Sequence, residues 1–263
     1  MHPTDTFLDR ALEVARRAAA AASTVILEHY RGGPLEVRHK ADDSPVTRAD
    51  IEAERAIREV LREAFPEHAI HGEEEGRSGG GDWLWLVDPI DGTKGFVRGY
   101  PLFSTQIALM HEGRLVLGVS AAPAYGETAW ARRGGGAFLD GRPIRCADTR
   151  DWNRATLSTG NLATLARGPG WQRLGELVPR LHRVRGYGDF LHYHLLARGA
   201  IDLVVESDVN ILDIAALAVI VGEAGGVMTD LDGHALTLDT CSVLAGVPAL
   251  HAQALEHFAG WRA

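Results

Sequence analysis

Residues 83–96 read Trp-Leu-Trp-Leu-Val-Asp-Pro-Ile-Asp-Gly-Thr-Lys-Gly-Phe. The apolar run 83–87 is short and rich in aromatic residues, which is typical of a strand buried on both faces. The run stops at Asp88, and Pro89 is expected to end the ladder because proline has no N–H group. Asp88 and Asp91 are therefore predicted to emerge on a turn at the end of this strand. Two carboxylates on a rigid strand end suit Mg²⁺, which prefers oxygen ligands.

The same residues have a simpler interpretation, because Asp-Pro and Asp-Gly are both turn-forming dipeptides. If the turn opens a helix, the N–H groups around Gly92 and Thr93 would hold an anion beside the metal. A turn alone and a metal site both remain open at this point, and further acidic residues are needed to choose between them.

The composition limits the classes of function. The chain has 263 residues, 46% of them apolar and 24% charged, which fits one large globular domain or two packed halves. A formal charge of −8 argues against nucleic acid or an anionic membrane as a general partner. No segment has the length needed to span a bilayer. Cys146 and Cys241 lack metal-ligand spacing and suggest a reducing compartment.

The N-terminal apolar stretch 18–27 is interpreted as part of an amphipathic helix rather than a signal peptide. Acidic residues at Asp5, Asp9 and Glu13 precede it, and apolar residues recur from Phe7 with helical spacing. We therefore expect a cytoplasmic protein.

The pattern of elements changes near residue 150. Before it, we predict a first helix ended by Gly32-Gly33-Pro34 and a second over 51–64, followed by an antiparallel meander over 102–110, 115–121 and 127–132. After it, strands alternate with helices, the predicted strands being 154–159, 201–205 and 241–247 and the helices 171–178, 189–198, 211–224 and 248–258. This predicts an α+β half at 1–150 followed by an α/β half at 151–263, packed as one compact unit.

Two acidic features lie close in sequence to residues 83–96. Asp50 stands at the start of the helix predicted over 51–64, where a carboxylate caps free N–H groups, and capping alone is a sufficient explanation for it. Glu73, Glu74 and Glu75 are adjacent, which usually marks a solvated turn. Only a short glycine-rich loop separates them from Asp88, so one of them is a candidate for the same metal.

Asp213 is the third feature. An acid in the first turn of a helix stabilises it by about 0.3–1 kcal/mol through the helix dipole. Asp213, however, lies among the apolar residues 211–217, and a carboxylate is costly to bury there unless it is paired or coordinates a metal. Together with Glu73, Asp88 and Asp91 it would complete an all-oxygen site for two hard cations.

These residues fall into motifs that resemble those of the inositol monophosphatase family. The motifs are Gly72-Glu-Glu74, Asp88-Pro-Ile-Asp-Gly-Thr93, and Asp213-Ile-Ala-Ala216 followed by Glu223-Ala-Gly-Gly226. Lys40, the segment from Ser44 to Asp50, and the Gly-Ala-Phe-x-x-Gly segment ending at Gly141 extend the resemblance over almost the whole chain. The resemblance implies a layered αβαβα sandwich, hydrolysis of a phosphomonoester with two to three Mg²⁺ ions per site, and a homodimer.

The resemblance also implies roles for individual residues. The metal ligands would be Glu73, Asp88, the Ile90 carbonyl, Asp91 and Asp213. The catalytic residues would be Glu73, Thr93 and Asp50, with Thr93 bonded to Asp50 and orienting the attacking water. The N–H groups of Gly92 and Thr93 would hold the phosphate.

Two details are similar to the histidinol-phosphatase branch. Enzymes acting on inositol phosphates commonly continue Thr-Asn-Phe, whereas this chain continues Lys94-Gly-Phe-Val-Arg98-Gly-Tyr-Pro101. It also has Gly188-Asp189 where those enzymes tend to have Gly-Ser. Histidinol phosphate carries an ammonium group and an imidazole, so an acidic wall of Asp189 and Glu206 would favour it over a neutral polyol. Lys94 and Arg98 are further expected substrate contacts.

Two other functions stay open. One is hydrolysis of inositol 1-phosphate or another small sugar or nucleotide phosphate by the same metal site. The other is a regulatory binding protein that keeps the phosphatase fold, although the complete set of acids argues against loss of activity. His192 and His194 are expected to be packing or surface residues rather than catalytic ones.

Overall fold

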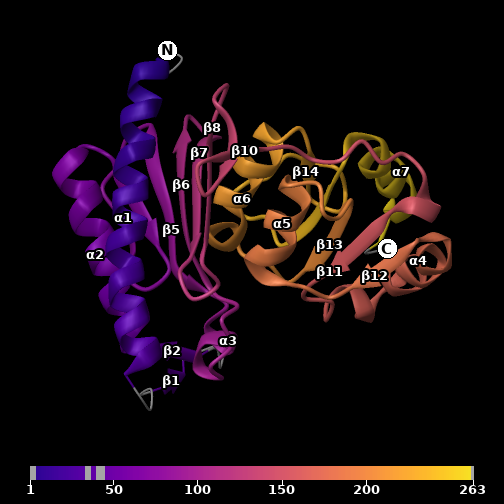
Figure 1. Cartoon of the computed structure of the whole chain (residues 1–263), viewed down its shortest axis with the longest axis horizontal. Coiled ribbons are helices and arrows are strands. Elements are labelled where there is room, and N and C mark those ends of the chain that lie inside the picture. The colour runs from indigo at the N-terminus through magenta and orange to yellow at the C-terminus, as the bar shows by residue number, and fades with distance from the viewer. Residues whose placement is uncertain (1–3, 33–36, 40–44, 262–263) are drawn as a thin grey trace.

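Helices and sheets alternate in five layers, in the order αβαβα, in the computed structural model (Figure 1). The structure describes residues 4–32, 37–39 and 45–261. Lys40 and Ser44, which belong to the family resemblance, lie outside the described residues. The helices are α1 (Asp5–Arg31), α2 (Arg48–Ala64), α3 (Thr93–Val97), α4 (Pro169–Leu177), α5 (Asp189–Ala197), α6 (Ile211–Glu223) and α7 (Pro248–Phe258). The layered fold predicted above is confirmed.

An eight-stranded sheet forms the second layer, in the order β10-β9-β8-β7-β6-β5-β3-β4. Its strands are β3 (Ala69–Gly72), β4 (Gly76–Ser78), β5 (Trp83–Asp91), β6 (Ser104–His111), β7 (Arg114–Ala122), β8 (Glu127–Arg132), β9 (Gly136–Leu139) and β10 (Arg142–Ile144). All neighbours are antiparallel except β3 and β5, and the predicted meander corresponds to β6, β7 and β8. A separate short hairpin pairs β1 (Val37–His39) with β2 (Pro45–Thr47).

The strand β5 is longer than the sequence predicts. It continues through Pro89 to Asp91, and its pairing with β6 shifts between Asp88 and Asp91. Two residues of β5, Pro89 and Ile90, lie opposite Thr105 alone, which is the arrangement of a β-bulge. The missing N–H of Pro89 is tolerated because the bulge removes it from the ladder. The predicted turn is therefore a bulge within the strand.

Helices cover both faces of this sheet. The first layer, α1 and α2, packs on one face, and α6 packs on the other against the central strands (Figure 1). Gly118 of β7 allows the close approach of α6, because a Cβ there would lie 2.7 Å from the Ala216 Cα. Helix α6 thus belongs to the second half of the chain yet buries the sheet of the first half.

A five-stranded sheet forms the fourth layer, in the order β12-β11-β13-β15-β14. Its strands are β11 (Thr156–Thr159), β12 (Arg183–Arg185), β13 (Leu203–Ser207), β14 (Val227–Thr229) and β15 (Ser242–Gly246). Helices α5 and α6 lie between the two sheets, and α4 and α7 form the outer layer (Figure 1). The strand β14 was not predicted, and the strand expected over 201–205 extends through Glu206 to Ser207 as β13. The division of the chain near residue 150 stays a prediction.

Three further expectations can be compared with the structure. Among the described helices, none combines the length and the apolar character needed to cross a membrane. Cys146 is partly buried and Cys241 is exposed, and the two are not joined by a disulfide bond. His192 and His194 are fully buried in α5 and hydrogen-bonded, which agrees with their expected packing role.

Candidate active site

The bulge in β5 brings two carboxylates to one place. In a regular strand, residues three apart point to opposite faces of the sheet. The extra residue between Asp88 and Asp91 changes this alternation, so both side chains reach the same side. The Asp88 carboxylate accepts a hydrogen bond from the Ile90 N–H at 2.9 Å, and the Asp91 carboxylate accepts one from the Ser104 hydroxyl at 3.3 Å.

Helix α6 supplies the third carboxylate. Asp213 is the third residue of the helix and accepts the Asn210 N–H at 3.1 Å, while the Asn210 side chain caps the helix in return. This reciprocal capping box fixes both the start of α6 and the direction of the acid. One carboxylate oxygen from each of Asp88, Asp91 and Asp213 lies within 4.8 Å of the other two.

The electrostatics of this cluster favour a cation. Burial, followed by repulsion from Glu73, Asp213 and Asp91, raises the pKa of Asp88 well above its ordinary value. Burial and repulsion from Asp189 and Asp213 likewise raise the pKa of Asp91. Burial raises the pKa of Asp213 from 3.8 to about 6, although the Asn210 N–H opposes the rise. Asp88 is buried and Asp91 and Asp213 are half-buried, and three clustered acids that repel one another are stabilised by protons or a bound cation.

Thr93 and Asp50 form the side of the site next to α3. The Asp50 carboxylate accepts both the N–H and the hydroxyl of Thr47, at 2.8 and 2.7 Å. The N-cap of α2 is therefore Thr47, and Asp50 completes its capping box rather than capping the helix itself. The other oxygen of Asp50 lies 3.3 Å from the Thr93 hydroxyl, which also lies 2.9 Å from the Ile90 carbonyl. The single hydroxyl hydrogen thus has two acceptors, one of them predicted to be a metal ligand.

The three clustered carboxylates and Thr93, but not Asp50, are among the residues that line a cavity of roughly 200 Å³. Its lining residues are Glu73, Asp88, Ile90, Asp91, Gly92, Thr93, Lys94, Gly95, Asn161, Asp189 and Asp213. Helix α3 begins at this cavity, and its N-cap Gly92 has φ 86° and provides no side-chain cap. Among the described residues, no side chain caps the N–H groups at the start of this helix. Lys94 is the only cationic residue among the described residues that line the cavity.

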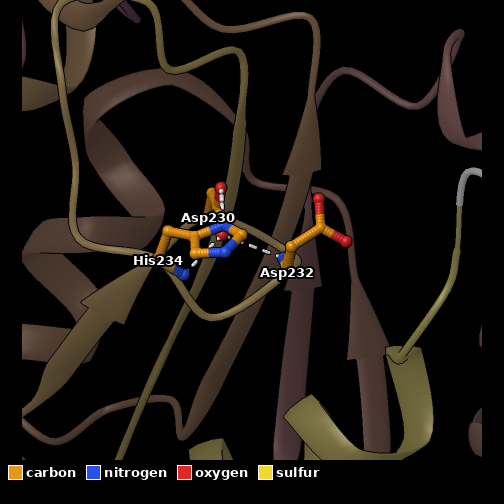
Figure 2. A group of neighbouring side chains, drawn as sticks. All are labelled: Asp230, Asp232 and His234. Atoms are coloured by element: carbon orange, nitrogen blue, oxygen red, sulfur yellow. Dashed lines mark hydrogen bonds and ion pairs between the residues drawn. The ribbon is translucent and has the colours of Figure 1, made fainter.

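A second acidic group lies on a turn far along the chain. Asp230, Asp232 and His234 come together after β14, with Asp232 and His234 exposed (Figure 2). The Asp230 carboxylate accepts the N–H groups of Asp232 and His234 at 2.9 and 2.8 Å, and it lies 3.2 Å from the His234 ring. Since these bonds already account for the arrangement, we interpret the group as a turn motif.

Comparison with known proteins shows the family to which this chain belongs. The model of the inositol monophosphatase family matches residues 8–260. The chain belongs to the inositol monophosphatase family. A histidinol-phosphatase of Streptomyces coelicolor is 40% identical over 234 residues, covering 85% of this chain and 87% of that protein. A histidinol-phosphatase of Mycobacterium tuberculosis is 43% identical over 217 residues, covering 80% and 84%.

A solved structure shows the same fold. The crystal structure of the extragenic suppressor protein suhB from Bartonella henselae superposes with a TM-score of 0.87 at 28% identity, covering 95% of this chain and 98% of that one. Together these relatives support a phosphatase of the inositol monophosphatase family.

The four predicted substrate contacts of this family member lie in different environments. Asp189 and Lys94 line the cavity. Arg98 is exposed at the end of α3 and is not one of the described residues lining the cavity. Glu206 is only 4% exposed and, unlike Asp189, is not one of the described residues lining the cavity. It lies behind the cavity wall, where its carboxylate accepts hydrogen bonds from the Tyr193 hydroxyl at 2.7 Å and the Asn161 N–H at 3.2 Å.

Asp189 has an unusual backbone conformation. It is the first residue of α5 with φ 46°, and its N-cap, Gly188, makes no side-chain cap bond. Asp and Asn tolerate this left-handed region better than most residues do. Burial and repulsion from Glu206 raise the pKa of Asp189, while His192 and Lys94 lower it. Because the N-cap is Gly188 and Asp189 lines the cavity, the Asp189 side chain belongs to the cavity and does not serve as a helix cap.

Sequence reasoning missed two residues that shape the site. Asn161 lines the cavity from the end of β11 and donates its side-chain N–H to the Asp208 carbonyl at 3.3 Å. Ser104 is buried on β6 and donates to Asp91. Neither residue belongs to a motif used above, but Ser104 begins β6 and Asn161 lies in the loop that follows β11, where polar residues often serve a site.

Proposed function

We propose that this protein hydrolyses L-histidinol phosphate to L-histidinol and phosphate with the help of Mg²⁺. The observation that carries the proposal is an acidic side chain, Asp189, in the same cavity as the clustered carboxylates of Asp88, Asp91 and Asp213. The resemblance to histidinol-phosphatases supports the same substrate.

The residues present fit Mg²⁺. The clustered carboxylates are all-oxygen ligands, their pKa values are raised by burial and mutual repulsion, and Lys94 alone among the described lining residues opposes them. The residues that would hold the ions are Glu73, Asp88, the Ile90 carbonyl, Asp91 and Asp213. When bound, Mg²⁺ supplies positive charge for the phosphate oxygens and makes a water molecule more acidic.

The protein's own groups would orient the reactants. With its hydrogen directed to Asp50, the Thr93 hydroxyl presents its lone pairs to the cavity and accepts a hydrogen bond from the attacking water. The N–H groups of Gly92 and Thr93 would hold the phosphate at the start of α3, where the N-cap Gly92 has no side chain to compete for them. Asp50 itself is held by two bonds from Thr47, so the water-orienting pair is preorganised.

Asp189 would recognise the organic part of the substrate. A carboxylate favours the ammonium and imidazole groups of histidinol over the neutral hydroxyls of inositol. The Glu206 carboxylate would contribute negative charge to the pocket without contacting the substrate, because Gly160 and Asn161 lie between it and the cavity. It accepts the Asn161 N–H, and a Cβ at Gly160 would overlap it.

The test is phosphate release with Mg²⁺ from L-histidinol phosphate and from inositol 1-phosphate at matched concentrations. We expect a preference for histidinol phosphate of about a hundredfold, roughly 2.7 kcal/mol in transition-state stabilisation. Asp189→Asn keeps the left-handed backbone and should reduce this preference about tenfold, leaving inositol 1-phosphate hydrolysis unchanged. Asp239→Asn, an exposed acid outside the cavity, is the matched control.

Other results would support the alternatives. Comparable rates on the two substrates would indicate a broad small-molecule phosphatase. No Mg²⁺-dependent hydrolysis of either would favour a regulatory binding protein. The homodimer implied by the family is part of the proposal and is checked by sedimentation equilibrium.

A further inference from the structure

Helix α2 carries a second buried carboxylate besides Asp50. This residue, Glu54, lies directly behind the turn that carries Glu73. Asp50, Glu54 and Arg58 are spaced four residues apart and therefore share one face of the helix. Glu54 is completely buried, yet its carboxylate has three donors. It accepts the N–H groups of Glu74 and Glu75 at 2.7 and 3.1 Å, and the Arg58 Nε–H at 2.7 Å.

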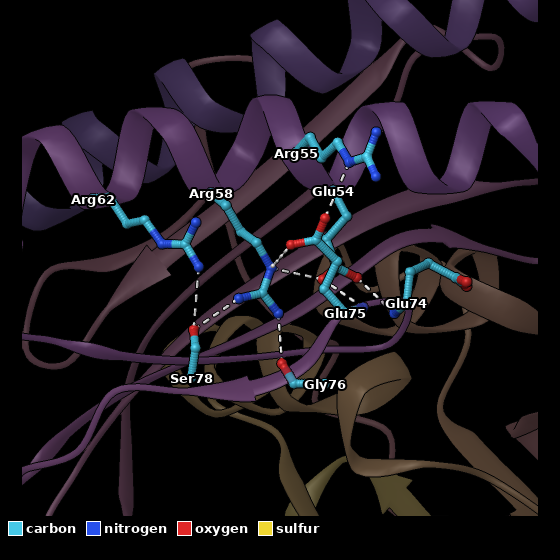
Figure 3. Close-up of polar contacts among 8 residues, drawn as sticks. All are labelled: Glu54, Arg55, Arg58, Arg62, Glu74, Glu75, Gly76 and Ser78. Carbon is cyan, nitrogen blue, oxygen red and sulfur yellow. Dashed lines mark hydrogen bonds and ion pairs between the residues drawn. The ribbon is translucent and has the colours of Figure 1, made fainter.

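Arg58 extends this contact to the strand that follows the turn. The guanidinium is 1% exposed and donates to the Ser78 hydroxyl at 3.0 Å and to the Gly76 carbonyl (Figure 3). In Figure 3 the side chains of Glu54 and Arg58 project from α2 toward the β3–β4 hairpin. The buried pair thus ties α2 to the hairpin over residues 74–78.

The neighbouring Gly72 shows how closely the carboxylate fits. A Cβ at Gly72 would lie 2.1 Å from one Glu54 oxygen and 2.7 Å from the other. Gly72 does not have a positive φ, so glycine is required there by space and not by backbone conformation. The Glu54 carboxylate therefore occupies the volume that a side chain at residue 72 would fill.

Glu73 is held on both sides as a result. Its own N–H donates to the Val87 carbonyl at 3.1 Å, next to Asp88, and the next two N–H groups along the chain donate to Glu54. The Glu73 side chain lies near enough to Asp88 to raise its pKa, and it lines the cavity. Without the two bonds that its N–H groups donate to Glu54, the turn would lose the support that directs Glu73 toward Asp88.

We propose that Glu54 is a positioning residue that holds the Glu73 turn in the conformation needed for metal binding. The inference rests on the proposed function, since it takes Glu73 as a metal ligand. Residues that orient metal ligands typically change metal affinity by about 10–100-fold when they are removed. If the Glu54 carboxylate only stabilised the fold, its removal would lower the melting temperature and leave the metal affinity unaltered.

The test measures divalent-cation affinity directly, by calorimetric titration with Mn²⁺ and by the loss of the free Mn²⁺ electron paramagnetic resonance signal. Glu54→Gln replaces an acceptor with an NH₂ group that opposes the backbone donors, and we expect its Mn²⁺ affinity to fall at least about tenfold. Gly72→Ala keeps Glu54 but displaces its carboxylate, and should lower the affinity by a similar factor. Glu54→Asp keeps the charge on a shorter side chain and should show an intermediate loss.

Two controls separate positioning from stability. Ile57→Val removes a methyl group from a fully buried residue of the same helix, so it should lower the melting temperature without altering Mn²⁺ affinity. Arg55→Ala removes an exposed ion pair to Glu75, 3.1 Å long, and should leave both unchanged. Normal affinity in folded Glu54→Gln and Glu54→Asp, or an equal loss in Ile57→Val, would overturn the proposal.

The outcomes also distinguish this inference from the proposed function. If the wild-type protein binds Mn²⁺ tightly but hydrolyses no phosphate ester, the proposed function fails while the comparison of Glu54 variants still decides the inference. If the wild-type protein binds no divalent cation, the assignment of Glu73 as a ligand is wrong, and the role of Glu54 is refuted with it.

Discussion

Asp213→Asn should stabilise the protein when no metal is bound. The folded protein raises the pKa of Asp213 from 3.8 to about 6. This rise corresponds to about 3 kcal/mol, since one pKa unit is worth about 1.36 kcal/mol. The folded state therefore carries that cost whenever the carboxylate is ionised. The asparagine removes the charge but accepts the Asn210 N–H more weakly, by about 1 kcal/mol. We expect a net gain of about 2 kcal/mol in unfolding free energy at pH 7.5.

The pH dependence follows from the direction of the shift. Because the folded protein holds this proton more tightly than the unfolded chain, the stability of the metal-free protein falls as pH rises from 3.8 toward about 6. Above that range the full free-energy cost of ionising Asp213 in the folded protein is present, and near pH 4 this cost is almost absent. The advantage of Asp213→Asn should therefore be present at pH 7.5 and largely lost at pH 4.

The assay is urea unfolding of both proteins in EDTA at the two pH values, repeated at pH 7.5 with Mg²⁺. A ligand at 100 times its dissociation constant stabilises the folded state by about 2.7 kcal/mol. Mg²⁺ should thus raise the stability of the wild-type protein to or above that of Asp213→Asn, which loses a ligand. Equal or lower stability of the variant in EDTA at pH 7.5 would refute the electrostatic reasoning.

Three shorter predictions concern other parts of the site. Asp91→Asn should reduce Mg²⁺-dependent phosphate release at least about a hundredfold, because it removes a central ligand; near-normal turnover would show that the ligand assignment is wrong. Gly160→Ala places a Cβ against the Glu206 carboxylate and should cost about 1–3 kcal/mol in urea unfolding. Thr47→Ala removes the cap of α2 and one of two bonds to Asp50, so unfolding free energy should fall by about 1–2 kcal/mol. Unchanged unfolding midpoints would contradict the last two.

Much of the fold and the cluster of acidic residues could be predicted from local patterns. The apolar run beginning at Trp83 forms a central strand, and the last helix begins and ends where the sequence predicts, at Pro248 and Phe258. Asp88 and Asp91 were singled out because two carboxylates follow a buried apolar run, and Asp213 because a carboxylate among apolar residues needs a partner. Such inferences succeed because burial, periodicity and the missing N–H of proline are local properties of the chain.

The spatial relations among distant residues needed the tertiary structure. The turn expected after Asp88 is a bulge, since only pairing with β6 shows which residues face one another. Glu206 was expected to line the wall, yet it lies behind it, because the position of α5 and β11 decides which carboxylate reaches the cavity.

Glu54 shows the same limit most clearly. In the sequence it is one charged residue on an amphipathic helix, and solvent exposure is the usual state of such a residue. Its burial against Gly72 and its bonds to Glu74 and Glu75 depend on how α2 packs beside a hairpin about 20 residues away in the chain. The sequence by itself determined which residues could bind a cation. Only the packing of separate elements decided which residues hold those ligands in place, because hydrogen bonds and excluded volume act between atoms that the chain order does not bring together.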